Sequence, residues 1–230
     1  MTGARTVAAP QEYWERYYAE QFRFGLGTED ILAALVQVPP IHRWADLGCG
    51  SESLLWAIAL RAERLVAVDA DSQRLAILRE FAAVERPRGI HRTALTLCGR
   101  TEPDAFVNRC RSLKATVVAD CLTGAPLGDS ILAATKVELV TQFGLLGLCS
   151  SEQHFLDCFA AVHQLLASDG WAAGANWVAR DLAERVELTE PLYWQAAANA
   201  GISLLLLRRI PSADPEFPAV WTYLGRKRHP

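Results

Sequence analysis

Short apolar runs alternate with amphipathic stretches along most of the chain, and this alternation predicts the order of its helices and strands. Apolar residues at helical spacing predict helices, whereas short apolar or β-branched runs bounded by turn residues predict strands. The predicted helices are Tyr13–Phe22, Thr28–Val36, Glu52–Leu60, Ser72–Phe81, Asp104–Leu113, Glu152–Leu166 and Pro191–Ala200. The predicted strands are Arg43–Leu47, Leu65–Val68, Ala115–Ala119, Val137–Phe143, Trp171–Val178, Ser203–Leu207 and Ala219–Leu224.

The order of these elements predicts an α/β fold built on one doubly wound, Rossmann-like sheet. Seven strands, mostly parallel, are expected between layers of helices, and the last two strands are expected to form an antiparallel hairpin at one edge. Thr28 is the expected N-cap of its helix, and Asp169-Gly170 is the expected turn before the strand Trp171–Val178. Ligands of such sheets bind beyond the carboxyl ends of the strands, near the point where the strand order reverses.

The composition limits the classes of protein to consider. The chain has 230 residues, 23 Lys+Arg against 26 Asp+Glu, a formal net charge of −3 and 51% hydrophobic residues. That length fits one compact domain, for which we expect an N-terminal helical cap or lid at residues 1–40 and a core at residues 41–230. The hydrophobic fraction is too high for a disordered chain, and the charge balance argues against a nucleic-acid partner.

Cysteine usage and the N-terminus bear on the compartment. The six cysteines contain no CxxC pair, which favours reduced buried thiols over disulfides, and we predict no metal site. Residues 1–6 lack the apolar core of a signal peptide, and no apolar run approaches the roughly eighteen residues that span a bilayer. We therefore expect a cytoplasmic protein without a membrane partner, whose oligomeric state, monomer or homodimer, stays open.

The segment Trp44–Ser51 carries the clearest chemical signal, because it leads from a strand into glycines at positions 48 and 50. Glycines let the backbone turn tightly and approach a ligand, and the helix that follows offers free N–H groups. Asp69 ends the next strand about twenty residues later, where an acid accepts the hydroxyl hydrogens of a ribose. Together these residues predict an adenosine site.

Two chemistries use this geometry, and two residues distinguish them. A dinucleotide site requires a third glycine three positions after Gly50, where this chain has Ser53. Asp46, just before the first glycine, would repel a pyrophosphate but suits the ammonium group of a methionine moiety. These residues favour S-adenosylmethionine over a nicotinamide cofactor; the remaining alternative is a tight turn at Gly48 and Gly50 with Asp69 as a surface acid or helix cap.

With these residues in view, the chain resembles a class I S-adenosylmethionine-dependent methyltransferase. It is similar, more narrowly, to the nicotinamide, phenylethanolamine and indolethylamine N-methyltransferase family. The segments that carry the resemblance are Glu12–Tyr18, Asp46–Ser51, Asp120–Gly128 and Val220–Lys227, so it covers most of the chain.

The resemblance implies contacts to S-adenosylmethionine. Its carboxylate would bind to Tyr13 and Tyr18, its ribose to Asp69 and Ala70, and its adenine to Asp120 and Cys121. The full expected set is Tyr13, Tyr18, Asp46, Gly48, Gly50, Ser51, Asp69, Ala70, Asp120 and Cys121.

The substrate side departs from the family. Relatives carry an acid three residues before the cysteine that aligns with Cys149, and this chain has Leu146 there. A cationic acceptor is therefore disfavoured, and we expect a small, neutral, aromatic or heteroaromatic acceptor, with N-methylation favoured, in specialised metabolism. The expected substrate-contacting residues are Tyr17, Phe143, Leu146, Phe155, Asn176 and Trp177.

Methyl transfer needs alignment in a dry pocket more than acid–base chemistry, unless the acceptor must lose a proton. Tyr17 and His154 are the candidate catalytic residues. Tyr17 has the alternative of packing its helix, His154 of being exposed or structural, and Asn176 of satisfying local backbone groups. The open alternatives for the whole chain are an O- or S-methyltransferase and a non-catalytic S-adenosylmethionine-binding regulatory protein.

Overall fold

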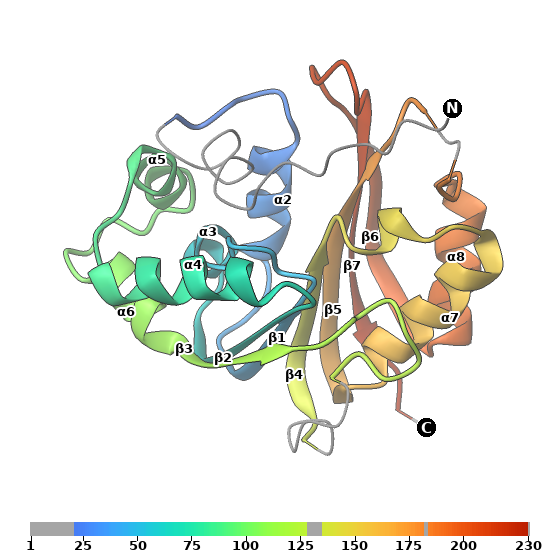
Figure 1. Ribbon diagram of the computed structural model, residues 1–230, viewed down its shortest axis with the longest axis horizontal. Helices are drawn as coiled ribbons and strands as arrows, with labels where there is room; N and C mark the ends of the chain where they lie inside the picture. Colours follow the sequence, from blue (N-terminus) through green and yellow to red (C-terminus); the bar gives the residue numbers. More distant parts are fainter. Residues whose placement is uncertain (1–20, 128–134, 182–183, 230) are drawn as a thin grey trace.

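The computed structural model of the chain describes residues 21–127, 135–181 and 184–229. Its strands are β1 (Ile41–Leu47), β2 (Ala62–Asp69), β3 (Leu113–Val118), β4 (Val137–Phe143), β5 (Leu166–Val178), β6 (Ile202–Pro211) and β7 (Ala219–Lys227). They form one seven-stranded sheet in the order β3-β2-β1-β4-β5-β7-β6 (Figure 1). The five strands β1 to β5 pair in parallel, and β7 pairs antiparallel with both β5 and β6. The predicted Rossmann-like sheet with an antiparallel last strand is confirmed.

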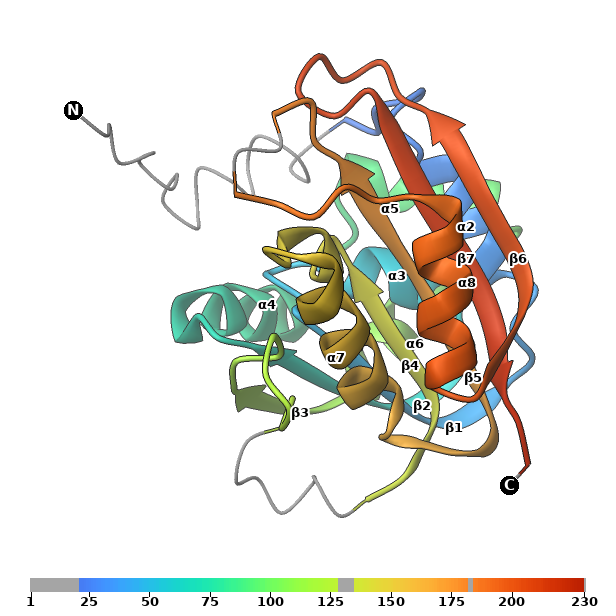
Figure 2. The same ribbon diagram turned by 90° about the vertical axis from the view of Figure 1, so that its right-hand side faces the viewer.

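Helices cover both faces of this sheet. Those described are α2 (Thr28–Leu35), α3 (Leu54–Ala59), α4 (Ser72–Val84), α5 (Gly89–Leu97), α6 (Ala105–Ser112), α7 (Glu152–His163) and α8 (Glu190–Asn199), with a short 3-10 helix η2 (Leu146–Leu148). Helices α2 to α6 lie on one side of the sheet, and α7 and α8 lie on the other (Figures 1 and 2). None of the described helices has the length and apolar character that a bilayer crossing requires.

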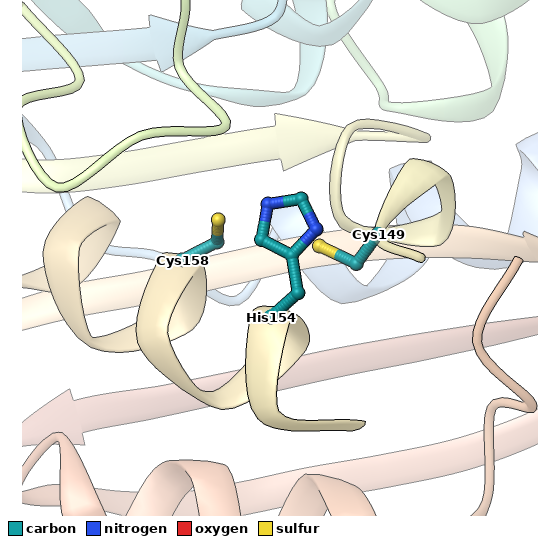
Figure 3. Close-up of side chains that lie close together, drawn as sticks. All are labelled: Cys149, His154 and Cys158. Atoms are coloured by element: carbon teal, nitrogen blue, oxygen red, sulfur yellow. The ribbon is translucent and has the colours of Figure 1, made fainter. Parts of the chain in front are cut away.

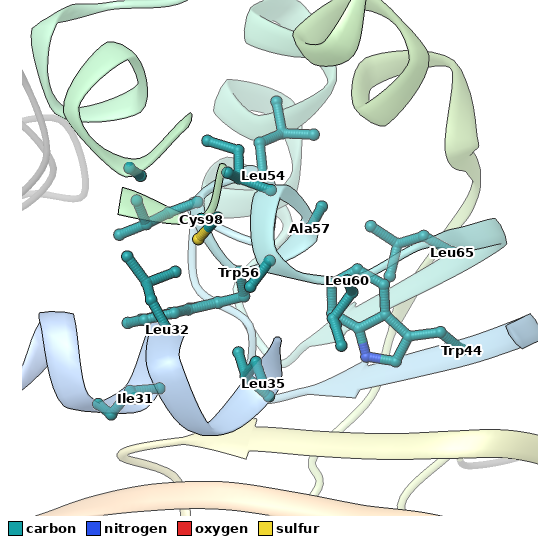
Figure 4. Close-up of a cluster of buried hydrophobic side chains, with 14 of the residues drawn as sticks. Ile31, Leu32, Leu35, Trp44, Leu54, Trp56, Ala57, Leu60, Leu65 and Cys98 are labelled. Carbon is teal, nitrogen blue, oxygen red and sulfur yellow. The ribbon is translucent and has the colours of Figure 1, made fainter. Parts of the chain in front are cut away.

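Two apolar clusters form the core, one on each face of the sheet. Alternate strand residues point to opposite faces, so Trp44 and Leu139 join one cluster while Ala45 and Val140 join the other. Figure 4 shows the first cluster, in which α3 lies between the sheet and neighbouring helices. All six residues of α3 are buried, as expected of a helix that has neighbours on every side.

Two local expectations need correction, and one helix was not predicted. The N-cap of α2 is Gly27 rather than Thr28, and its backbone is left-handed without a side-chain cap. The turn expected at Asp169-Gly170 lies inside β5, which already begins at Leu166; the β4–β5 register shifts there, and Asp169 takes a positive φ of 60°. Helix α5 was not predicted, because its buried face contains a polar residue, His91, beside Ile90 and Ala94.

Candidate active site

A cavity of about 950 Å³ opens at the carboxyl ends of the parallel strands. It lies where the strand order reverses, between β1 and β4, which is the position expected for a ligand in a doubly wound sheet. Its volume is at the upper end of the usual range for small-molecule sites. The cavity therefore has room for a large ligand or for two smaller molecules together.

The glycine loop after β1 forms one wall of the cavity. Gly48 and Gly50 have φ values of 63° and 59°, in the left-handed region that other residues rarely adopt. The loop is tied to β2 by two backbone donors: Cys49 N–H donates to Val68 O at 3.0 Å, and Gly50 N–H donates to the Asp69 carboxylate at 2.8 Å. Ser51 also lines the cavity.

Asp69, the last residue of β2, lines the same cavity, and so do Ala70 and Asp71. Its second carboxylate oxygen accepts from Asp71 N–H at 2.9 Å. A carboxylate oxygen has more than one acceptor site, so each oxygen keeps capacity for a hydroxyl donor from a ligand. Asp71 itself caps α4 by accepting from Gln73 N–H, which fixes the turn between β2 and that helix.

Asp46 does not line the cavity but lies fully buried beneath the glycine loop. Ser53 Oγ donates to one of its oxygens at 2.7 Å and Thr141 Oγ1 to the other at 2.6 Å, and Trp44 Nε1 donates to the same Thr141 hydroxyl. Burial raises the pKa of Asp46 to about 7, against the opposing effect of the two hydroxyl donors. The structure therefore gives Asp46 internal partners rather than direct access to a ligand.

Asp120 and Cys121 line the cavity beyond the end of β3. Asp120 is exposed and accepts from Leu122 N–H, while Cys121 is buried and its thiol donates to Pro126 O. Burial raises the pKa of Cys121 to about 12, so the thiol stays protonated near neutral pH.

Aromatic side chains form another part of the cavity lining. Phe143 ends β4 and stacks on Trp56 with ring centroids 4.2 Å apart, and Trp177, one residue before the end of β5, also lines the cavity. Phe22 and Phe217 line it as well. Such surfaces favour flat, apolar ligands over strongly hydrated ones.

Besides Asp46, four sequence-predicted residues of the described part do not line the cavity. Leu146 and Phe155 are fully buried in the second core cluster. Asn176 is buried as well, where it accepts from Gly147 N–H and donates to Tyr193 Oη. His154 has both ring nitrogens in hydrogen bonds, to Leu122 O and to Ser150. Predictions for Tyr13, Tyr17 and Tyr18 fall outside the described residues.

Other lining residues were missed by sequence reasoning. Arg185, Asp214 and Phe217 reach the cavity from loops far along the chain, and Arg185 lies over the Phe217 ring at 6.0 Å. The oxygen Oδ1 of Asp214 accepts from two backbone N–H groups of its own turn. No motif or spacing marks these positions, because long-range packing alone brings them to the site.

Comparisons with known proteins add a result about the fold. No family model matches the sequence, and no curated protein matches it. Solved structures do resemble it: N-methyltransferase NodS from Bradyrhizobium japonicum WM9, in complex with S-adenosyl-L-homocysteine, has a TM-score of 0.60 at 12% identity, over 96% of this chain and 99% of that one.

Two further solved structures agree. Magnesium protoporphyrin IX methyltransferase from Synechocystis PCC 6803, with bound S-adenosylmethionine, has a TM-score of 0.60 at 13% identity, over 96% of this chain and 92% of that one. A TehB-like methyltransferase from Corynebacterium glutamicum has a TM-score of 0.59 at 14% identity, over 95% of this chain and 96% of that one. The chain thus has the fold of class I S-adenosylmethionine-dependent methyltransferases.

Replacing the two loop glycines separates backbone strain from steric conflict. A Cβ on Gly48 would lie 2.7 Å from Leu145 Cδ1 and 2.9 Å from its Cβ, whereas a Cβ on Gly50 meets nothing nearer than 4.0 Å. Gly50→Ala should lower the free energy of unfolding by about 1–2 kcal/mol through the left-handed backbone alone. Gly48→Ala should lower it by about 2–4 kcal/mol because overpacking adds to the strain. Equal losses for the two variants in urea unfolding would contradict this geometry.

The buried carboxyl of Asp46 should make stability depend on pH. Its folded pKa of about 7 exceeds the ordinary value of 3.8, so the folded state holds a proton that the unfolded state releases. Its contribution to the free energy of unfolding therefore falls as the pH rises from about 4 to about 7. Between pH 5 and pH 8 the free energy of unfolding of the protein should fall by about 2–3 kcal/mol more than that of an Asp46→Asn variant, as measured by urea unfolding. The exposed control Asp104→Asn should follow the unmodified protein, and an equal pH dependence with and without Asp46 would contradict the assignment.

Proposed function

We propose that the chain is an S-adenosylmethionine-dependent methyltransferase with its cofactor in the described cavity. The observation that carries the proposal is the meeting of the Gly48–Gly50 loop and the Asp69 carboxylate on one wall of that cavity. The structures of NodS and of the magnesium protoporphyrin enzyme, which share this fold, hold S-adenosyl-L-homocysteine and S-adenosylmethionine. Bound here, the cofactor would supply an electrophilic methyl group on a sulfonium centre.

The lining residues suit the parts of that cofactor in turn. Asp69, with spare acceptor sites, would hold the ribose hydroxyls, and the open backbone at Gly48 and Gly50 would lie along the methionyl arm. Asp120 and Cys121 would lie at the adenine. Asp46 would act from beneath, by holding the loop in shape rather than by touching the ligand.

We further propose a small, neutral, aromatic or heteroaromatic acceptor, with methylation at nitrogen favoured. Phe143, Trp177 and Phe217 offer flat apolar surface in the cavity lining. The resemblance of the sequence to the nicotinamide, phenylethanolamine and indolethylamine N-methyltransferase family supports methylation at nitrogen. His154, the candidate base, does not line the cavity, and both of its ring nitrogens are engaged, by Leu122 O and by Ser150. An acceptor that loses no proton, such as a neutral ring nitrogen, fits that arrangement best.

Catalysis would then rest on alignment and on exclusion of water. Holding the two reactants together in one orientation supplies about 7–11 kcal/mol of a barrier. We propose that residues 1–40 cap the site for this purpose. Within its described part, residues 21–40, Phe22, Arg23, Leu26 and Thr28 line the cavity.

The function is tested by offering S-adenosylmethionine with a panel of acceptors and following S-adenosyl-L-homocysteine by mass spectrometry. We expect turnover with neutral ring-nitrogen acceptors and at least about tenfold less with the same rings carrying a separate quaternary ammonium substituent, because Arg185 in the lining repels a fixed positive charge. Matched phenols and thiols on the same rings report on the O- and S-methyltransferase alternatives.

Asp69→Ala provides the control within the site. Loss of a charged acceptor for the ribose should raise the dissociation constant for S-adenosyl-L-homocysteine at least about tenfold in calorimetry, since such hydrogen bonds contribute about 1.5–3 kcal/mol each. Asp104→Ala, an exposed acid on another surface, should leave it unchanged. If the unmodified protein binds no S-adenosyl-L-homocysteine, or the two variants bind it equally well, the proposed cofactor site is refuted.

A further inference from the structure

Two thiols and an imidazole meet behind the wall of the cavity. Cys149 directly follows η2, and His154 and Cys158 belong to α7. One ligand atom of each residue lies within 4.8 Å of those of the other two, and Figure 3 shows the three side chains close together. Both cysteines are buried, and His154 is partly exposed.

The backbone holds this arrangement in place. Ser151 caps α7 by accepting from His154 N–H, and a spacing of four residues puts His154 and Cys158 on the same face of the helix. Cys149 is fixed by its own backbone, whose N–H donates to Leu146 O and whose carbonyl accepts from Val186 N–H at 2.7 Å. The cluster is thus preformed by local structure.

The hydrogen bonds of His154 set its tautomer. Its Nε2 lies 3.2 Å from Leu122 O, and a carbonyl only accepts, so Nε2 carries the proton. The lone pair is then on Nδ1, which accepts only long bonds of 3.3 Å from Ser150 N–H and Oγ. A histidine that binds a metal through one nitrogen and donates from the other to a backbone carbonyl is the usual arrangement at metal sites.

We propose that Cys149, His154 and Cys158 form a zinc site. Two thiolates and a neutral imidazole are ligands that zinc prefers, and a solvent water at the exposed side of His154 would complete four-coordination. Two thiolates also balance the charge of a divalent ion, which suits a buried position. Zinc–ligand distances of about 2.0–2.3 Å place neighbouring ligand atoms roughly 3.5–3.8 Å apart, so the cluster needs to contract by about 1.3 Å at most.

Zinc binding at this site would release protons. Zinc binds the thiolate form of cysteine, so each of the two thiols would give up its proton to solvent when the metal enters.

The site would brace the wall of the cavity. Leu122, whose carbonyl receives His154, lines the cavity, as do Gly147 and Leu148 of η2. A metal bound to Cys149 and to α7 would therefore tie these two lining segments to one helix. The expected effect of the metal is to hold these two segments in place, with water in its fourth position, whether or not the chain transfers methyl groups.

The test uses the full chain produced without a polyhistidine tag. Titrated with zinc and freed of loosely bound metal, it should retain one equivalent by plasma mass spectrometry. Cobalt in place of zinc should give thiolate charge-transfer bands and the visible absorption of tetrahedral cobalt. At free zinc about 100 times the dissociation constant, the melting temperature should rise by about 5–10 °C.

Variants assign the ligands. Cys149→Ser, Cys158→Ser and His154→Gln should each lose the bound metal or weaken it at least tenfold, while Cys110→Ser, a buried thiol of α6 outside the cluster, should retain it. An unmodified protein that retains no zinc and gives no cobalt–thiolate bands overturns the proposal. So does undiminished binding by the three cluster variants, or an equal loss in Cys110→Ser.

Discussion

The carboxyl of Asp46 is the interaction on which the position of the site depends. Ser53 at the start of α3 and Thr141 on β4 both donate to it, and Trp44 supports the Thr141 hydroxyl from the same strand as Asp46. Thr141 is also the residue paired with Asp46 across the β1–β4 ladder. A buried carboxyl without partners would be costly, so these donors fix how β1, β4 and α3 meet.

The rest of the site follows from that junction. With β1 and α3 held, the intervening loop must turn within a few residues, which Gly48 and Gly50 achieve with left-handed backbones. The loop then presents its N–H groups to β2, where the Asp69 carboxylate accepts one of them and still faces the cavity. The two acids therefore have different roles. Asp46 is buried and fixes the shape of the loop, whereas Asp69 remains available to a ligand.

The sequence predicted correctly those elements whose pattern of apolar and polar residues, or whose motif, is local. The bounds of β4 agree with the sequence pattern, and the glycine loop and Asp69 lie on the cavity as their motif indicated. Helix α5 was not predicted because its buried face contains the polar residue His91. That side chain pairs with Glu52, a contact between segments that are distant in the sequence. Leu146 and Phe155 illustrate a second limit, since an apolar side chain has the same pattern whether it faces a cavity or the core.

A crystal structure of the full chain with S-adenosyl-L-homocysteine tests the central claim most directly. We expect the ribose hydroxyls on the Asp69 carboxylate and the homocysteine along Gly48–Gly50, with Asp46 still bonded to Ser53 and Thr141 beneath the loop. A ligand bound elsewhere, or one held in this cavity without contact to Asp69 and the glycine loop, would contradict the account.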